Sequence, residues 1–180
     1  APADKLPVLL DLFSKTAIEV CEGQQYDVDF ENDLAVTLPQ YIEMIRLKTA
    51  VLLAAALKMG AIIGGASLQD ANALYDYGIN LGLAFQLRDD YLDSFGDPAV
   101  FGKKIGGDIC CNKKTFLMIT ALQTASEEQC KELLQWIGCT DATCHEQKIK
   151  AVLNIYQDLQ IDTRCEEAIR AYFEKSVGSL

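Results

Sequence analysis

Apolar residues recur at helical spacing along almost the whole chain, and no segment shows the sustained alternation of a half-buried strand. The first stretch, residues 6–21, has its apolar positions at Leu6, Leu9, Leu10, Phe13, Ala17 and Val20. The four prolines lie near the start or at breaks between such stretches, so none of them interrupts a helix. We therefore predict an all-α fold in which residues 1–180 form one domain.

Capping residues and breaks predict where the helices begin and end. Gly23 suits the end of the first helix, so the polar segment 24–38 is expected to be a connection. Thr37 followed by Pro39 predicts a helix start, and Asp70 and Ser126 are expected to cap later helices. The glycine-rich segment from Gly96 to Asn112 is expected to be a long loop. The predicted helices span residues 6–21, 39–58 with an apolar extension to 66, 70–95, 113–122, a stretch after 126, 141–160 and 162–176.

Charge and composition exclude several classes of function. The chain has 16 lysines and arginines against 26 aspartates and glutamates, a formal charge of −10, so we predict no nucleic-acid partner. A single histidine, His145, excludes a site that needs two or more histidines. Seven cysteines without a C-x-x-C pair suggest free thiols and a cytoplasmic protein. The most apolar stretch, Ala50 to Ala66, is interrupted by Lys58, so we predict a helix buried on most sides and no membrane span.

One helical segment carries a stripe of acidic side chains. At 3.6 residues per turn its polar residues fall within an arc of about 100°; they are Gln86, Asp89, Asp90 and Asp93. Carboxylates this close repel one another, so either one of them takes up a proton or a cation offsets the repulsion. Hard oxygen ligands suit Mg²⁺, which takes one or two protein carboxylates together with substrate phosphates. The stripe therefore indicates Mg²⁺ that joins the protein to a phosphorylated ligand, although such a stripe is often only a solvated face.

Lysines follow the acidic helix. The segment from Asp97 to Lys114 carries a net charge of +2 within an acidic chain, because its lysines (103, 104, 113 and 114) outnumber its aspartates. Such a cluster could bind the outer oxygens of a polyphosphate or could simply be a solvated surface. Earlier in the chain, Lys48 lies in a very apolar helical stretch, where it must either extend to solvent or find an anion.

The motifs that carry these residues resemble a known family. FQLRDDYLDSFGD, followed by GKKIGGD and NKKT, is similar to the second aspartate-rich region of the trans-isoprenyl diphosphate synthases, the farnesyl and geranylgeranyl diphosphate synthase family. EGQQYD (Glu22–Asp27) and RLKTA (Arg46–Ala50) resemble two further motifs of that family, in the same order. The resemblance implies an all-α bundle of long helices around a central cavity, and a homodimer.

The resemblance also implies roles for particular residues. Asp89, Asp90 and Asp93 match the ligands of Mg²⁺, and the matching diphosphate-binding lysines are Lys48, Lys103 and Lys113. Thr49 and Gln86 match polar groups near the carbocation, whereas Gln24 and Asp27 match a pair that lines the cavity. Lys104 matches no ligand of the family. The implied reaction condenses isopentenyl diphosphate with an allylic diphosphate, which is dimethylallyl, geranyl or farnesyl diphosphate.

The sequence departs from the family at its beginning. The family carries a first aspartate-rich motif followed by paired arginines, and neither is present in these 180 residues. We therefore expect the C-terminal part of a synthase domain, inactive alone, because half of the metal ligands are missing. The alternatives are a non-catalytic partner subunit of a complete synthase, an acidic all-α interaction module and, more remotely, a terpene cyclase. Product chain length is not determined by these residues.

Overall fold

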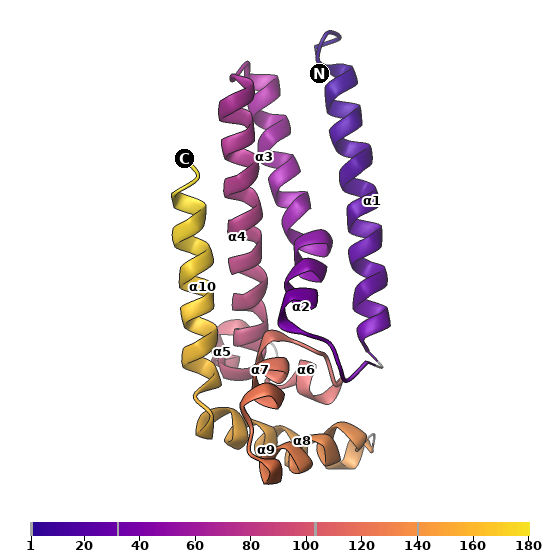
Figure 1. Ribbon diagram of the computed structural model, residues 1–180, viewed down its shortest axis with the longest axis vertical. Helices are drawn as coiled ribbons and strands as arrows, with labels where there is room; N and C mark the ends of the chain where they lie inside the picture. The colour runs from indigo at the N-terminus through magenta and orange to yellow at the C-terminus, as the bar shows by residue number, and fades with distance from the viewer. Residues whose placement is uncertain (1, 32, 103, 140) are drawn as a thin grey trace. The chain divides into compact units, whose positions relative to one another are not determined.

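A computed structural model describes residues 2–31, 33–102, 104–139 and 141–180, and these residues form helices and connections without a strand. This confirms the all-α prediction (Figure 1). The elements, in chain order, are α1 (Leu6–Phe30), α2 (Leu38–Ile45), a π-helical turn η1 (Arg46–Ala50), α3 (Val51–Gly64), α4 (Leu68–Phe95), α5 (Pro98–Phe101), α6 (Gly107–Cys110), α7 (Phe116–Thr124), α8 (Glu127–Gly138), a 3-10 turn η2 (Ala142–Cys144), α9 (His145–Asp158) and α10 (Ile161–Val177).

Side-chain caps set several helix starts. At α2 the backbone N–H of Gln40 donates to the Thr37 hydroxyl at 3.4 Å, and the Gln40 side chain accepts from the Thr37 N–H at 2.9 Å. Ser126 caps α8 in the same way, as predicted. The cap of α4 is Ser67 rather than Asp70, because the N–H of Asp70 donates to the Ser67 hydroxyl at 3.1 Å. The predicted cap of this helix was therefore three residues too late.

The first helix continues beyond the predicted end at Gly23 and reaches Phe30. Gly23 is buried in the middle of α1, and a Cβ atom there would lie 2.4 Å from the backbone nitrogen of Lys48. It would also lie 2.8 Å from the carbonyl carbon of Leu47. The glycine thus permits close contact between two backbones and does not end the helix. The predicted connection over residues 24–38 was wrong for its helical part, 24–30.

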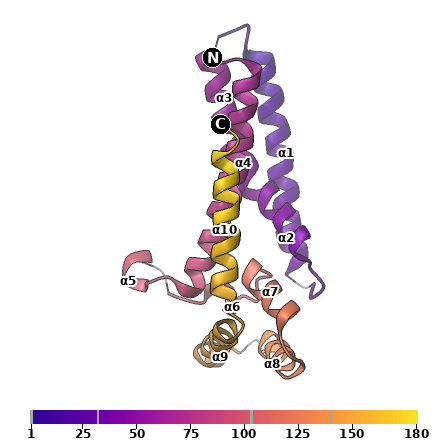
Figure 2. The same cartoon turned by 60° about the vertical axis from the view of Figure 1, so that its left-hand side comes forward.

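The chain folds into two compact units. The first unit comprises Ala1–Asp29, Ile42–Gln86 and Ala168–Leu180. Within it α1, α3 and the first part of α4 run side by side (Figures 1 and 2). Both η1 and α3 pack closely on α4, since Cβ atoms at Gly78 and Gly82 would lie 2.5 Å and 2.6 Å from the Cα atoms of Ala54 in α3 and Ala50 in η1. The prediction of a single domain stays a prediction.

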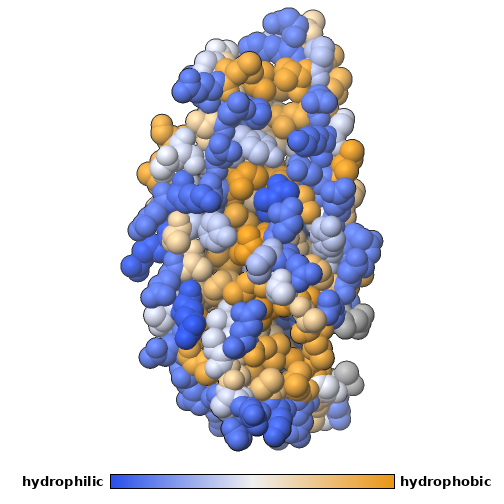
Figure 3. Space-filling model, in the orientation of Figure 1, coloured by the Kyte–Doolittle hydropathy of each residue, from blue (hydrophilic) through white to orange (hydrophobic). Residues whose placement is uncertain are grey.

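The apolar stretch lies in this first unit. Within the described part of the chain, one helical run, Leu38–Gly64, is long and apolar enough to cross a membrane, and 33% of its most apolar window is buried. The core helix of a globular protein meets the same test, and the close packing on α4 is typical of such a helix. The expectation of burial on most sides was wrong, because Leu52, Leu53 and Ile63 are exposed. Figure 3 shows apolar side chains at the molecular surface.

The second unit comprises Phe30–Tyr41 and Leu87–Glu167. In it α9 contacts α6, α7 and α8, and Figure 2 shows α8 and α9 close together. The expected long loop from Gly96 to Asn112 contains two short helices, α5 and α6. A deeply buried lysine, Lys148 of α9, donates to the Asn112 side-chain oxygen at 2.6 Å and to the Cys139 carbonyl at 3.3 Å. These bonds fasten the segment after α6 and the end of α8 to α9.

Candidate functional site

The π-helical turn η1 presents two neighbouring side chains to two different helices. Lys48 Nζ forms an ion pair with Asp27 Oδ2 of α1 at 2.6 Å. The hydroxyl of the next residue, Thr49, donates to Gln86 Oε1 of α4 at 3.2 Å. The hydrogen bond of a π turn spans one residue more than that of an α-helix, and such turns are frequent at functional sites. The backbone contact with Gly23 holds this turn against α1.

The ion pair with Asp27 explains how Lys48 is accommodated in an apolar helical stretch. A lysine in an apolar helix was expected to need solvent or an anion, and the structure supplies the carboxylate of Asp27. The sequence prediction had assigned both residues to the same site, with Lys48 as a diphosphate ligand and Asp27 as a residue that lines the cavity. Gln24 does not join them: it is exposed, and its side chain makes no hydrogen bond with the residues that the structure describes.

Asp90 of α4 is the most deeply buried of the three aspartates, with 6% of its surface exposed. Its Oδ2 atom accepts a hydrogen bond from the hydroxyl of Tyr41, which is itself only 2% exposed. Burial raises the pKa of Tyr41 well above its ordinary value, and the neighbouring Asp90 carboxylate raises it further. Tyr41 therefore stays protonated and donates. The sequence prediction did not include Tyr41, because it lies 49 residues away from Asp90.

Asp93 is held by backbone groups rather than by a side chain. Its Oδ2 accepts the N–H of Asp108 at 2.9 Å, and a Cβ at Gly107 would lie 3.0 Å from its Oδ1. Burial is the main cause that raises the pKa of Asp93, and the backbone hydrogen bonds lower it. The sequence suggested that repulsion among the three aspartates would lead one of them to take up a proton. In the structure, burial is the largest cause of the raised pKa of Asp93, and the charge of Asp108 is a smaller one.

Asp108 is a second residue that the sequence prediction missed. Its N–H holds Asp93, and its carboxylate forms an ion pair with Lys113 Nζ at 3.2 Å. The signal was present in the sequence, because Asp108 follows the glycine pair of GKKIGGD, where small residues allow a backbone to approach a side chain. Asp89 differs from Asp90 and Asp93, since its side chain makes no hydrogen bond with the described residues.

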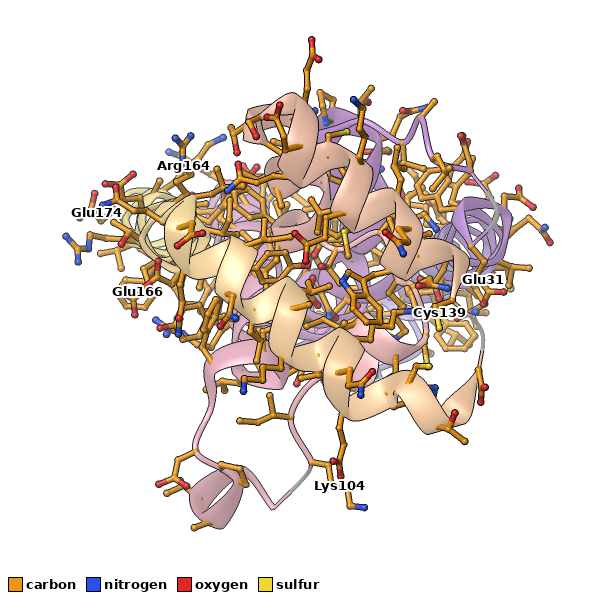
Figure 4. All side chains as sticks on the ribbon, turned by 90° about the horizontal axis from the view of Figure 1, so that it is seen from below. Glu31, Lys104, Cys139, Arg164, Glu166 and Glu174 are labelled. Carbon is orange, nitrogen blue, oxygen red and sulfur yellow. The ribbon has the colours of Figure 1, made fainter. Side chains whose placement is uncertain are left out.

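The four lysines after α4 have different surroundings. Lys113 remains half exposed beside Asp108. Lys114 is buried and donates to the carbonyls of Glu31 and Asn112 at 2.8 Å and 3.0 Å, so it serves the fold. The side chain of Lys104 points outward from its loop (Figure 4). Lys103, a predicted diphosphate ligand, lies outside the described residues.

The aspartates do not form a complete metal cage. Among the described residues, no group of three or more histidine, cysteine, aspartate or glutamate side chains could hold a metal ion by itself. The donor set of Asp89, Asp90 and Asp93 nevertheless fits Mg²⁺ that is shared with a ligand, because Mg²⁺ prefers oxygen and takes few protein carboxylates. The assignment of these residues to metal and substrate stays a prediction.

Comparison with known proteins gives the class of this chain. Residues 3–156 match the profile of the family described as Polyprenyl synthetase, so the chain belongs to that family. A short chain isoprenyl diphosphate synthase of Methanothermobacter thermautotrophicus is 46% identical over 138 residues. That match covers 77% of this chain and 41% of the relative.

Solved structures share the fold. The crystal structure of a geranylgeranyl pyrophosphate synthase aligns with a TM-score of 0.93 at 44% identity, over 99% of this chain and 55% of the other. A geranylgeranyl pyrophosphate synthase from Corynebacterium glutamicum, complexed with isoprenyl diphosphate and magnesium, aligns with a TM-score of 0.89 at 32% identity. This alignment covers 98% of our chain and 50% of the other. The chain thus spans about half the length of the proteins it matches.

Proposed function

We propose that this chain serves a Mg²⁺-dependent prenyl transfer, in which isopentenyl diphosphate is condensed with an allylic diphosphate. The observation that carries the proposal is the aspartate-bearing end of α4, where Asp90 and Asp93 are each held by a separate protein donor. Oriented carboxylates followed by a lysine suit a metal-bound diphosphate. Membership of the polyprenyl synthetase family supports the same reaction.

In this reaction the allylic carbon–oxygen bond breaks, and the double bond of isopentenyl diphosphate attacks the resulting carbocation before a proton is lost. Asp89, Asp90 and Asp93 would hold Mg²⁺, which supplies positive charge to the leaving diphosphate when it is bound. In the second unit Lys113 adds positive charge for the same group. In the first unit Lys48 offers an ammonium group, and the Thr49 hydroxyl contributes a dipole. No side-chain nucleophile is needed, which agrees with the single histidine.

A binding and turnover experiment tests this proposal. The complete protein, as expressed from its gene, is titrated with inorganic pyrophosphate at fixed Mg²⁺ by calorimetry, and then assayed with labelled isopentenyl diphosphate and geranyl diphosphate. We expect saturable pyrophosphate binding that EDTA abolishes and an acid-labile prenyl product. Asp89→Asn should weaken both, whereas Asp70→Asn, which removes one negative charge from the first turn of the same helix, should change neither.

The results separate the candidate functions. Binding without Mg²⁺ dependence contradicts the metal role of the aspartates. Mg²⁺-dependent binding without turnover favours the non-catalytic partner subunit over the synthase. An absence of any diphosphate binding favours the acidic interaction module.

A further inference from the structure

We propose that Tyr41 is a positioning residue for Asp90, and that it sets the affinity of the aspartate-bearing end of α4 for Mg²⁺. The inference rests on the proposed function, since it assumes that Asp90 takes part in metal binding. It goes further because it assigns a role to a residue that belongs to none of the recognised sequence motifs. Tyr41 does not touch the metal in this proposal; it acts through the Asp90 carboxylate.

The burial of the pair supports this role. Tyr41 and Asp90 are 2% and 6% exposed, so water cannot replace the hydroxyl as a donor without a rearrangement. A buried carboxylate needs hydrogen-bond donors, and the Tyr41 hydroxyl is the donor to its Oδ2 atom, so loss of this hydroxyl removes part of the compensation for burial. The Thr37–Gln40 box fixes the start of α2, and the N–H of Tyr41 donates to the Thr37 carbonyl at 3.0 Å. The tyrosine therefore comes from a capped helix and not from a mobile loop.

The chemistry of Mg²⁺ gives this contact a consequence. Mg²⁺ demands nearly ideal octahedral geometry and tolerates little error in ligand placement. Donors that orient a ligating carboxylate commonly change metal affinity 10- to 100-fold when they are removed. Asp93 is oriented by a backbone N–H, which a change of the Asp108 side chain to any residue other than proline would retain. Asp90 is oriented by a side-chain hydroxyl, so its positioning can be tested by removal of a single oxygen atom.

The test compares Tyr41→Phe with Tyr156→Phe in the complete expressed protein. Both tyrosines are almost fully buried, but the Tyr156 hydroxyl makes no hydrogen bond with the described residues. Pyrophosphate binding is measured by calorimetry over a series of Mg²⁺ concentrations, and melting curves without ligand check folding. We expect Tyr41→Phe to raise the Mg²⁺ concentration for half-saturation about 10-fold. Tyr156→Phe should leave it unchanged.

A double-mutant cycle separates positioning from a general loss of structure. In an Asp90→Asn background, Tyr41→Phe should have less than about a twofold further effect on the Mg²⁺ requirement, because the carboxylate that it orients is gone. If Tyr41→Phe in the wild-type background leaves the Mg²⁺ requirement unchanged, the inference about Tyr41 is overturned and the proposed function is not. An equal loss in both backgrounds also overturns it, since Tyr41 would then act independently of Asp90. An absence of Mg²⁺-dependent binding by the wild-type protein overturns the inference together with the proposed function.

Discussion

Gly23→Ala gives the sharpest test of how α1 positions the π-helical turn. The added Cβ would lie 2.4 Å from Lys48 N and 2.8 Å from Leu47 C, whereas ordinary van der Waals distances begin near 3.4 Å. The two atoms belong to the backbone, so no side-chain rotation relieves the clash, and the turn must move by about 1 Å. Overpacking of this kind costs about 3 kcal/mol at the upper end of its usual range. Alanine recovers about 1 kcal/mol of helix propensity, so we expect a net loss of about 2 kcal/mol.

Gly60→Ala is the matched control, because Gly60 is also helical and a Cβ there would meet nothing within 4 Å. The same chemical change should therefore stabilise the protein by about 0.5–1 kcal/mol. Urea denaturation measures the free energy of unfolding of both variants. A prenyl-transfer assay measures whether displacement of the turn that carries Lys48 and Thr49 lowers the rate. A displacement of about 1 Å can lower the rate about 100-fold, so Gly23→Ala should lose activity. If Gly23→Ala proves as stable as Gly60→Ala, the close contact is wrong and the reasoning fails.

Two further predictions concern buried polar groups. Burial raises the pKa of Asp93 in the folded state, so its contribution to stability is complete in acid and is lost as the pH rises through the folded pKa. Asp93→Asn should therefore have a higher free energy of unfolding than the wild type at neutral pH. Denaturation measured from pH 7 to pH 3 should show this difference shrinking as the pH falls. A difference that stays constant with pH would exclude a contribution from the titration of Asp93. Lys148→Met leaves the oxygens of Asn112 and Cys139 unpaired and should lower the free energy of unfolding by about 2 kcal/mol. The exposed Lys150→Met on the same helix should change it by less than about 0.5 kcal/mol, and equal effects would contradict a structural role for Lys148.

The features that could be predicted from the sequence are those that depend on near neighbours along the chain. The helical repeat predicted the all-α fold, and the same repeat placed Asp89, Asp90 and Asp93 on one arc of α4. Capping chemistry predicted the starts of α2 and α8 because a cap joins residues only three positions apart. Gly23 shows the limit of this reasoning. A glycine can end a helix or admit another backbone, and only the packing of η1 against α1 distinguishes the two.

The partners of the candidate functional groups depended on the tertiary structure. The sequence indicated that Lys48 must extend to solvent or find an anion, but the anion that it finds, Asp27, lies 21 residues away from it. The donor to Asp90 lies 49 residues away from it, and the donor to Asp93 lies 15 residues away. Lys113 and Lys114 are neighbouring residues of the same type that the sequence does not distinguish. Lys113 remains half exposed beside Asp108, whereas Lys114 is buried and donates to two backbone carbonyls. Local spacing determines which groups share a helical face, whereas burial and the packing between helices determine which of them are held in place and which remain available to a ligand.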